Sequence, residues 1–134
     1  MNANKISVSL IVPCKNEEAN IERCLKSVPW VGEAFVIDSQ SSDRTAEIAE
    51  KIGARVVQFD YQGGWPKKKN WALENLPFEN EWVLILDADE CLPPEAEGEI
   101  RAIVEDQNAP NAGYWINRRY FFMGQALKHA YFPN

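Results

Sequence analysis

The stretch Ile6-Ser7-Val8-Ser9-Leu10-Ile11-Val12-Pro13 decides the fold, because it is rich in β-branched and apolar residues and ends at a proline. A run of this kind predicts a buried strand over residues 6–12. Apolar residues then recur at the spacing of one helix face over residues 21–28, and Pro29 stops that helix. A strand followed directly by a helix is the repeating unit of α/β folds.

The alternation of strand and helix continues along the chain. Gly53 stands where a left-handed residue commonly ends a helix. Four strand–helix repeats with short connections predict an α/β fold, in which a mostly parallel sheet carries helices on both faces. The strand over residues 82–86 is apolar enough to be buried on both of its faces. The other predicted strands cover residues 34–37, 55–59 and 113–117, and the other predicted helices cover residues 45–52, residues 66–76 and the segment opened by Pro93-Pro94.

The composition describes one soluble globular domain, with 134 residues, 46% apolar content and 25% charged content. The net charge of −6 argues against a nucleic-acid-binding protein, which would present a basic face. Cys14, Cys24 and Cys91 are too few and too scattered for a disulfide framework, so we expect reduced thiols. No apolar run approaches the ~18 residues of a membrane-spanning helix. We therefore expect a cytoplasmic protein, at most bound peripherally to the cytoplasmic face of a membrane.

Charge is unevenly distributed along the chain. All 20 acidic residues lie between Glu17 and Asp106, within the strand–helix repeats of residues 1–106. Residues 107–134 carry no acidic residue and are rich in aromatic and basic ones. Two interpretations remain open for this part. It is a surface for anionic lipid or an amphipathic acceptor, or it is a core strand and a segment whose packing partners come later in a longer chain.

Acidic residues follow directly after predicted strands. In a parallel sheet, ligands bind beyond the carboxyl ends of the strands, near the point where strand order reverses. Asp87 and Asp89 follow the strand over residues 82–86, and in an extended segment residues two apart point the same way. Two close carboxylates suit Mg²⁺ or Mn²⁺, which keep coordination positions open for phosphates. The sequence therefore predicts a divalent cation site that would receive a diphosphate.

The signatures of several other sites are absent from the sequence. No glycine-rich dinucleotide or P-loop motif follows the first strand, and no nucleophile elbow surrounds a serine. The cysteines and His129 match no zinc spacing, so the cysteines are interpreted as buried thiols. The run Lys67-Lys68-Lys69 has two open interpretations: a solvated helix face, or a phosphate-binding helix start beside the loop at Gly63-Gly64.

Four motifs follow one another in a fixed order: a strand followed by Pro and Asn-Glu (IVPCKNEE, 11–18), an Asp-containing turn (VIDSQSSDRT, 36–45), a basic residue beside Asn (KNWAL, 69–73) and an Asp-x-Asp element (LILDADE, 84–90). These motifs and their order resemble those of family 2 glycosyltransferases. The run RRYFFMG at residues 118–124 is also similar to bacterial enzymes that extend lipopolysaccharide or lipooligosaccharide cores.

The resemblance implies a GT-A fold, in which residues 1–106 belong to the nucleotide-sugar-binding part and residues 107–134 begin the acceptor-side region. It implies metal-dependent transfer of a sugar, with inversion, from a nucleotide diphosphate donor, most simply a UDP-sugar. The acceptor would be a saccharide or a lipid-linked saccharide, as in lipopolysaccharide biosynthesis.

The resemblance also implies which residues contact the nucleoside. Pro13 and Glu17 would line the base and the ribose. Asp38 would accept a hydrogen bond from the imide N–H of the base, and a carboxylate, which only accepts, favours uracil over cytosine. Ser39-Gln40 departs from the family, which more often has Asp and Gly there.

A second group of residues would hold the diphosphate. Lys69, with Lys67 or Lys68, would lie near the nucleotide or its phosphates. Asp87 would contact the ribose or metal-bound water, and Asp89 would hold the Mn²⁺ or Mg²⁺ ion. That ion would act as a Lewis acid that neutralises the leaving nucleotide diphosphate.

The sequence departs from the family in its general base. Inverting transfer needs a base on the acceptor hydroxyl, and in this family it is an acidic residue well after the Asp-x-Asp element. No carboxylate follows Asp106, and Glu90 is the only nearby one that would substitute. We therefore expect the donor-binding part of a longer transferase, whose exposed sheet edge and apolar faces promote self-association.

Two other function classes stay open. One is a catalytically incomplete nucleotide-sugar-binding or interaction module, which keeps the acidic residues but lacks the base. The other is a nucleotidyltransferase, which also places Asp pairs on an α/β sheet. The sequence lacks the glycine-rich, basic first loop that a triphosphate would need, and consumption of a nucleoside triphosphate would favour this class.

Overall fold

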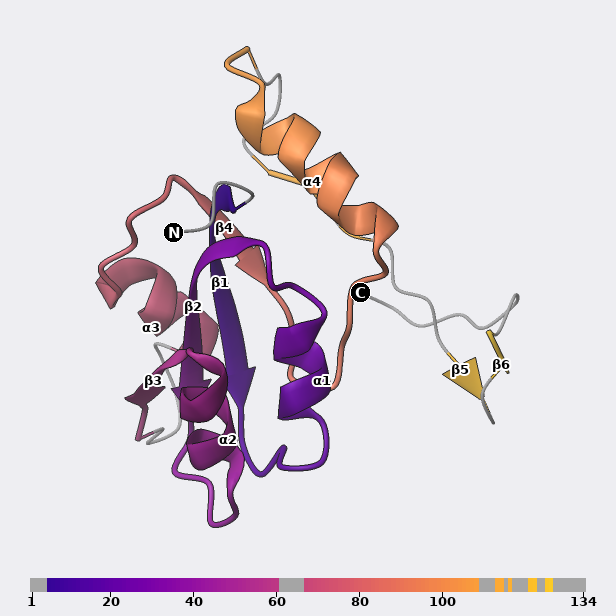
Figure 1. Ribbon diagram of the computed structural model, residues 1–134. Helices are drawn as coiled ribbons and strands as arrows, with labels where there is room; N and C mark the ends of the chain where they lie inside the picture. Colours follow the sequence, from indigo (N-terminus) through magenta and orange to yellow (C-terminus); the bar gives the residue numbers. More distant parts are fainter. Residues whose placement is uncertain are drawn as a thin grey trace.

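The computed structural model describes residues 5–60, 67–108, 113–114 and 116, and the backbone of two short strands near the C-terminus (Figure 1). The helices are α1 (Ile21–Lys26), α2 (Thr45–Ile52), α3 (Lys68–Asn75) and α4 (Glu95–Glu105), and the strands are β1 (Ile6–Cys14), β2 (Val31–Asp38), β3 (Arg55–Gln58), β4 (Trp82–Ile85), β5 (Phe121–Phe122) and β6 (Gln125–Ala126).

The sheet of the predicted strand–helix repeats is parallel. Its strand order is β3-β2-β1-β4, and each neighbouring pair runs in the same direction. Leu10 of β1 pairs with Ala34 of β2 on one side and with Leu84 of β4 on the other. The chain moves outward from β1 to β3 and then returns to the far side of β1. The order therefore reverses between β1 and β4, where open α/β sheets bind ligands.

Helices cover both faces of this sheet, which confirms the predicted architecture (Figure 1). Leu10 and Val12 of β1 point to the face that carries α1, α2 and α4. Ile11 points to the opposite face, where it joins a cluster with Phe35 of β2 and Ala72 of α3. Because successive residues of a strand face opposite sides, the continuous apolar run of β1 supplies both cores.

The strand β1 does not end before Pro13, as the sequence suggested, but continues to Cys14. The carbonyl of Ile11 points to the β4 side, where it accepts from the backbone N–H of Leu86. The nitrogen of Pro13 faces the same side, two residues later, and the pairing of β1 with β4 extends only as far as Ile11. Proline has no N–H to donate, so the pairing with β4 ends here while the pairing of β1 with β2 continues to Cys14.

Two predictions about the later strands are wrong. The strand β4 is not buried on both faces, because Ile85 is 37% exposed. β4 is also an edge strand of the described sheet. In the predicted strand over residues 113–117, Gly113, Tyr114 and Ile116 are in no strand, and its other two residues lie outside the described ones. Tyr114 and Ile116 are about half exposed, so these residues lack the burial of a core strand. The β5–β6 antiparallel pair was not predicted.

Candidate functional site

A cavity of about 700 Å³ lies at the carboxyl ends of β1 and β4, where the strand order reverses. Three segments that are distant in the sequence line it: residues 13–15 and 17 at and after the end of β1, residues 67–70 at the start of α3, and residues 87–89 after β4. Its size is typical of small-molecule sites. The cavity brings together Pro13, Glu17, Lys69, Asp87 and Asp89, five of the predicted site residues.

The segment after β4 is a tight turn, and not the extended segment that the sequence argument assumed. The backbone N–H of Glu90 donates to the carbonyl of Asp87 at 2.9 Å. In return, the backbone N–H of Asp87 donates to Glu90 Oε1 at 2.7 Å. Asp87 and Asp89 still line the same cavity, because the turn presents both to it. The Glu90 carboxylate therefore caps the acidic turn, which is a structural use of the group considered as a base.

The lysines at the start of α3 have separate roles. Lys68 Nζ donates to the carbonyl oxygen of Cys14 at 2.8 Å, and its partial burial lowers the pKa of the ammonium group. Lys69 Nζ lies 3.4 Å from Asp87 Oδ1, and both side chains are partly exposed. Lys67 is exposed at the N-cap of α3 and also lines the cavity. The run is therefore more than a solvated helix face, because two of its ammonium groups join α3 to the ends of β1 and β4.

Asp38 does not line the cavity with the other predicted residues. It is buried at the end of β2, with 1% of its surface exposed. Its carboxylate accepts from the backbone N–H and hydroxyl of Ser41, from Gln58 Nε2 at 2.8 Å, and from the Cys14 thiol at 3.7 Å. Both oxygens already have donors within the protein, so in this arrangement Asp38 supports the turn after β2 and the cavity wall at Cys14.

The loop after β1 is fixed to the loop after β2. Asn16 has a left-handed backbone with φ of +52°, a conformation that Asn tolerates better than most residues. Its backbone N–H donates to Ser41 Oγ at 2.8 Å, and its side-chain oxygen accepts from the backbone N–H of Ser42 at 2.8 Å. The backbone N–H of Glu17 donates to Thr45 Oγ1 at 2.9 Å. These bonds place Glu17 at the cavity. They also explain why asparagine precedes it, since Asn16 both adopts the left-handed backbone and accepts from Ser42.

Sequence reasoning missed four cavity residues, namely Cys14, Lys15, Asn70 and Ala88. Each lies inside a motif that the sequence analysis had already identified, so its position in the motif was the signal that could have found it. The interpretation of the cysteines also needs correction. Cys14 and Cys24 are buried and free, whereas Cys91 is exposed and free.

The donor set of the cavity fits a divalent cation only together with a ligand. Among the described residues, no group of three or more His, Cys, Asp or Glu side chains is placed to hold a metal. Asp87 and Asp89 supply carboxylate oxygens at one side of the cavity. Mg²⁺ and Mn²⁺ sites of this kind use one or two carboxylates and complete the shell with substrate phosphate and water. Two carboxylates facing a cavity with lysines fit that pattern.

Comparison with known proteins gives the family. The family model described as Glycosyl transferase family 2 matches residues 9–131. The chain belongs to glycosyl transferase family 2. An uncharacterized glycosyltransferase of Rickettsia bellii is 41% identical over 102 residues, which are 75% of this chain and 34% of that protein. The lipopolysaccharide core biosynthesis glycosyltransferase LpsC of Rhizobium meliloti is 28% identical over 127 residues, which are 90% of this chain and 45% of that protein.

Solved structures of glycosyltransferases share the fold. S. aureus TarS matches with a TM-score of 0.62 and 30% identity, over 75% of this chain and 20% of that chain. The M. tuberculosis glucosyl-3-phosphoglycerate synthase, solved with Mn²⁺, UDP and phosphoglyceric acid, matches with a TM-score of 0.52 and 28% identity, over 66% of this chain and 34% of that chain. The fold of this family 2 chain is therefore of the GT-A type. The chain spans less than half the length of the relatives reported above.

None of the helices within the described residues is long and apolar enough to cross a bilayer.

Proposed function

We propose that this family 2 chain binds a nucleotide diphosphate sugar, most simply a UDP-sugar, and takes part in its transfer with inversion to a saccharide or lipid-linked saccharide. The observation that carries the proposal is the shared cavity: two carboxylates of one turn and four lysines line it at the point of strand-order reversal. A diphosphate needs cations around it, and a protein of net charge −6 supplies them here locally.

The geometry supports a role for each part of the cavity. Pro13 and Glu17, at the β1 end, are proposed to contact the base and the ribose. Asp89, the more exposed carboxylate, is proposed to hold the cation together with Asp87, which is also proposed to contact the ribose or metal-bound water. Lys69 is proposed to contact the phosphates. When bound, Mn²⁺ or Mg²⁺ would supply charge neutralisation for the leaving diphosphate.

Because Asp38 is buried, the role that we propose for it differs from the one expected from the sequence. With its oxygens occupied by Ser41 and Gln58, Asp38 is proposed to position the Cys14 wall and the turn after β2. For Asp38 itself to accept a hydrogen bond from the imide N–H of the base, the turn at Ser41 would have to open. Glu90 is not proposed as the general base of the transfer, because its carboxylate caps the acidic turn.

The acceptor class is supported by similarity to a protein named for lipopolysaccharide core biosynthesis. A lipid-linked acceptor would bring the chain to the cytoplasmic face of a membrane, which agrees with the basic and aromatic composition of residues 107–134. This location is part of the proposal.

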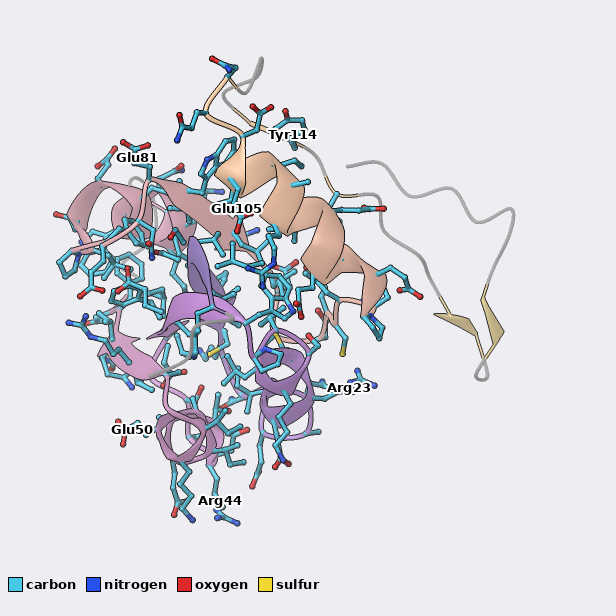
Figure 2. The ribbon with its side chains drawn as sticks, turned by 45° about the horizontal axis from the view of Figure 1, so that its top comes forward. Arg23, Arg44, Glu50, Glu81, Glu105 and Tyr114 are labelled. Carbon is cyan, nitrogen blue, oxygen red and sulfur yellow. The ribbon has the colours of Figure 1, made fainter. Side chains whose placement is uncertain are left out.

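The first test is calorimetric titration of UDP with and without Mn²⁺. We expect Mn²⁺ to tighten UDP binding by about tenfold or more, since it adds charge-assisted contacts to the diphosphate. Asp89→Ala should abolish that enhancement. The matched control is Glu50→Ala, because the exposed side chain of Glu50 projects from α2 away from α1 (Figure 2). Equal UDP affinity with and without Mn²⁺ in the unmodified chain would overturn the proposed donor site.

A further inference from the structure

The positively charged side chain of Lys69 lies next to one of the proposed metal ligands. Lys69 Nζ lies 3.4 Å from Asp87 Oδ1, both residues line the cavity, and 48% and 39% of the two side chains are exposed. A divalent ion shared by Asp87 and Asp89 would occupy the region into which this ammonium group projects. Two cations that compete for one carboxylate oppose each other's binding.

We propose that Lys69 is an exchangeable counter-ion: it neutralises Asp87 in the empty cavity and transfers to the diphosphate when the divalent cation takes Asp87. The inference rests on the proposed function, since it concerns the same cation and the same donor. It assigns to Lys69 two partners in succession, whereas contact with phosphate alone would assign one.

The surroundings of Lys69 suit such an exchange. The preceding residue, Lys68, is tied to the carbonyl oxygen of Cys14, which fixes the first turn of α3 against the end of β1. The backbone that carries Lys69 is therefore held in place, while its half-exposed side chain is free to turn on a four-carbon stem. A lysine has three donors on a compact charge and can change partners without a fixed planar geometry, unlike arginine.

The exchange predicts effects of opposite sign with and without nucleotide. Without nucleotide, removal of the Lys69 charge removes a competitor, so Mn²⁺ should bind about two- to fivefold more tightly, the range set by a partly exposed ion pair. With Mn²⁺ present, the same change removes a charged donor to the diphosphate, so UDP should bind about tenfold more weakly. A lysine that contacts only phosphate would weaken UDP binding and leave Mn²⁺ binding unchanged beyond the general effect of charge.

The test compares Lys69→Met with Lys67→Met in the full chain. Lys67 lines the same cavity and precedes the same helix, so it controls for the loss of one local charge. Free Mn²⁺ is measured by electron paramagnetic resonance without nucleotide, and UDP affinity is measured by calorimetry at saturating Mn²⁺. Lys69→Arg keeps the charge and tests the need for lysine, and circular dichroism verifies that each variant is folded.

The expected result is tighter Mn²⁺ binding in Lys69→Met than in Lys67→Met, together with weaker UDP binding. Lys69→Arg should bind Mn²⁺ as the unmodified chain does. If the two methionine variants bind Mn²⁺ equally, the exchange is overturned while the proposed donor site stands. If the unmodified chain binds Mn²⁺ neither alone nor with UDP, both the exchange and the metal part of the proposed function fail.

Discussion

Burial separates the three cysteines at the level of single residues. Cys14 and Cys24 are buried, and burial raises the pKa of each thiol to about 12, with nearby acidic groups adding to the rise. The thiolate is the reactive form, so at pH 8 only about one in 10⁴ of such thiols is ionised. Cys91 is exposed. The thiols are therefore distinguishable by chemistry as well as by position.

We predict that one thiol per chain reacts with a disulfide reagent at pH 8. Cys91→Ser should remove the fast reaction, whereas Cys14→Ser should leave it unchanged. In urea, all three thiols should react, because unfolding restores access and an ordinary pKa. Raising the pH toward 12 should speed the reaction of the buried thiols in the folded chain, since their ionised fraction rises with pH. Fast reaction of two or more thiols in the folded chain at pH 8 would contradict the burial described above.

At the scale of elements, the helix α1 holds the acidic turn in place. The Cys24 thiol donates to the carbonyl of Asp87 at 3.6 Å. Ser27 Oγ accepts from the backbone N–H of Leu92 at 3.1 Å and donates to the carbonyl of Cys24 at 2.7 Å. The turn that carries the proposed metal carboxylates is therefore fixed on both sides by α1 and its C-cap residue Ser27, which lie outside the cavity.

Ser27→Ala tests this attachment. The change leaves the Leu92 N–H without its acceptor, so the free energy of unfolding should fall by about 1 kcal/mol. The enhancement of UDP binding by Mn²⁺ should weaken as well, because the carboxylates become less well positioned. Urea unfolding and calorimetry measure the two effects. Ser7→Ala, an exposed change on β1, serves as the control. If both variants keep the full Mn²⁺ enhancement, α1 does not position the turn.

The elements were more predictable from the sequence than the contacts of the site. Hydrophobic periodicity located β1 to β4 and α1 to α4, and Gly53 ends α2 with φ of +106°, as its position predicted. The burial of Asp38 depends on Gln58 and Cys14, which lie 20 and 24 residues away in the sequence. No local pattern encodes such pairings. The turn at Asp87 was missed for a different reason. The Glu90 carboxylate accepts from the backbone N–H of Asp87, and in sequence such a carboxylate looks like one directed at a ligand.

At the scale of the whole molecule, the described sheet has two edge strands, β3 and β4. An edge strand presents unpaired backbone groups that can pair with another copy of the chain. On β4, Ile85 is 37% exposed and adds apolar surface to this edge. β3 carries Arg55, whose guanidinium lies over the ring of Phe35 at 5.0 Å. Since charged residues blunt sheet edges, β4 is the edge at which we expect association.

We predict that the chain self-associates with increasing concentration and that Ile85→Lys suppresses this association. A lysine places a charge on the edge and removes apolar surface, and both changes oppose strand pairing between copies. The matched control is Leu73→Lys, because Leu73 is 45% exposed but lies on a helix, α3. Sedimentation velocity over a hundredfold range of concentration measures the result. Equal suppression by both substitutions would assign the association to general apolar surface, and a monomer at the highest concentration would refute it.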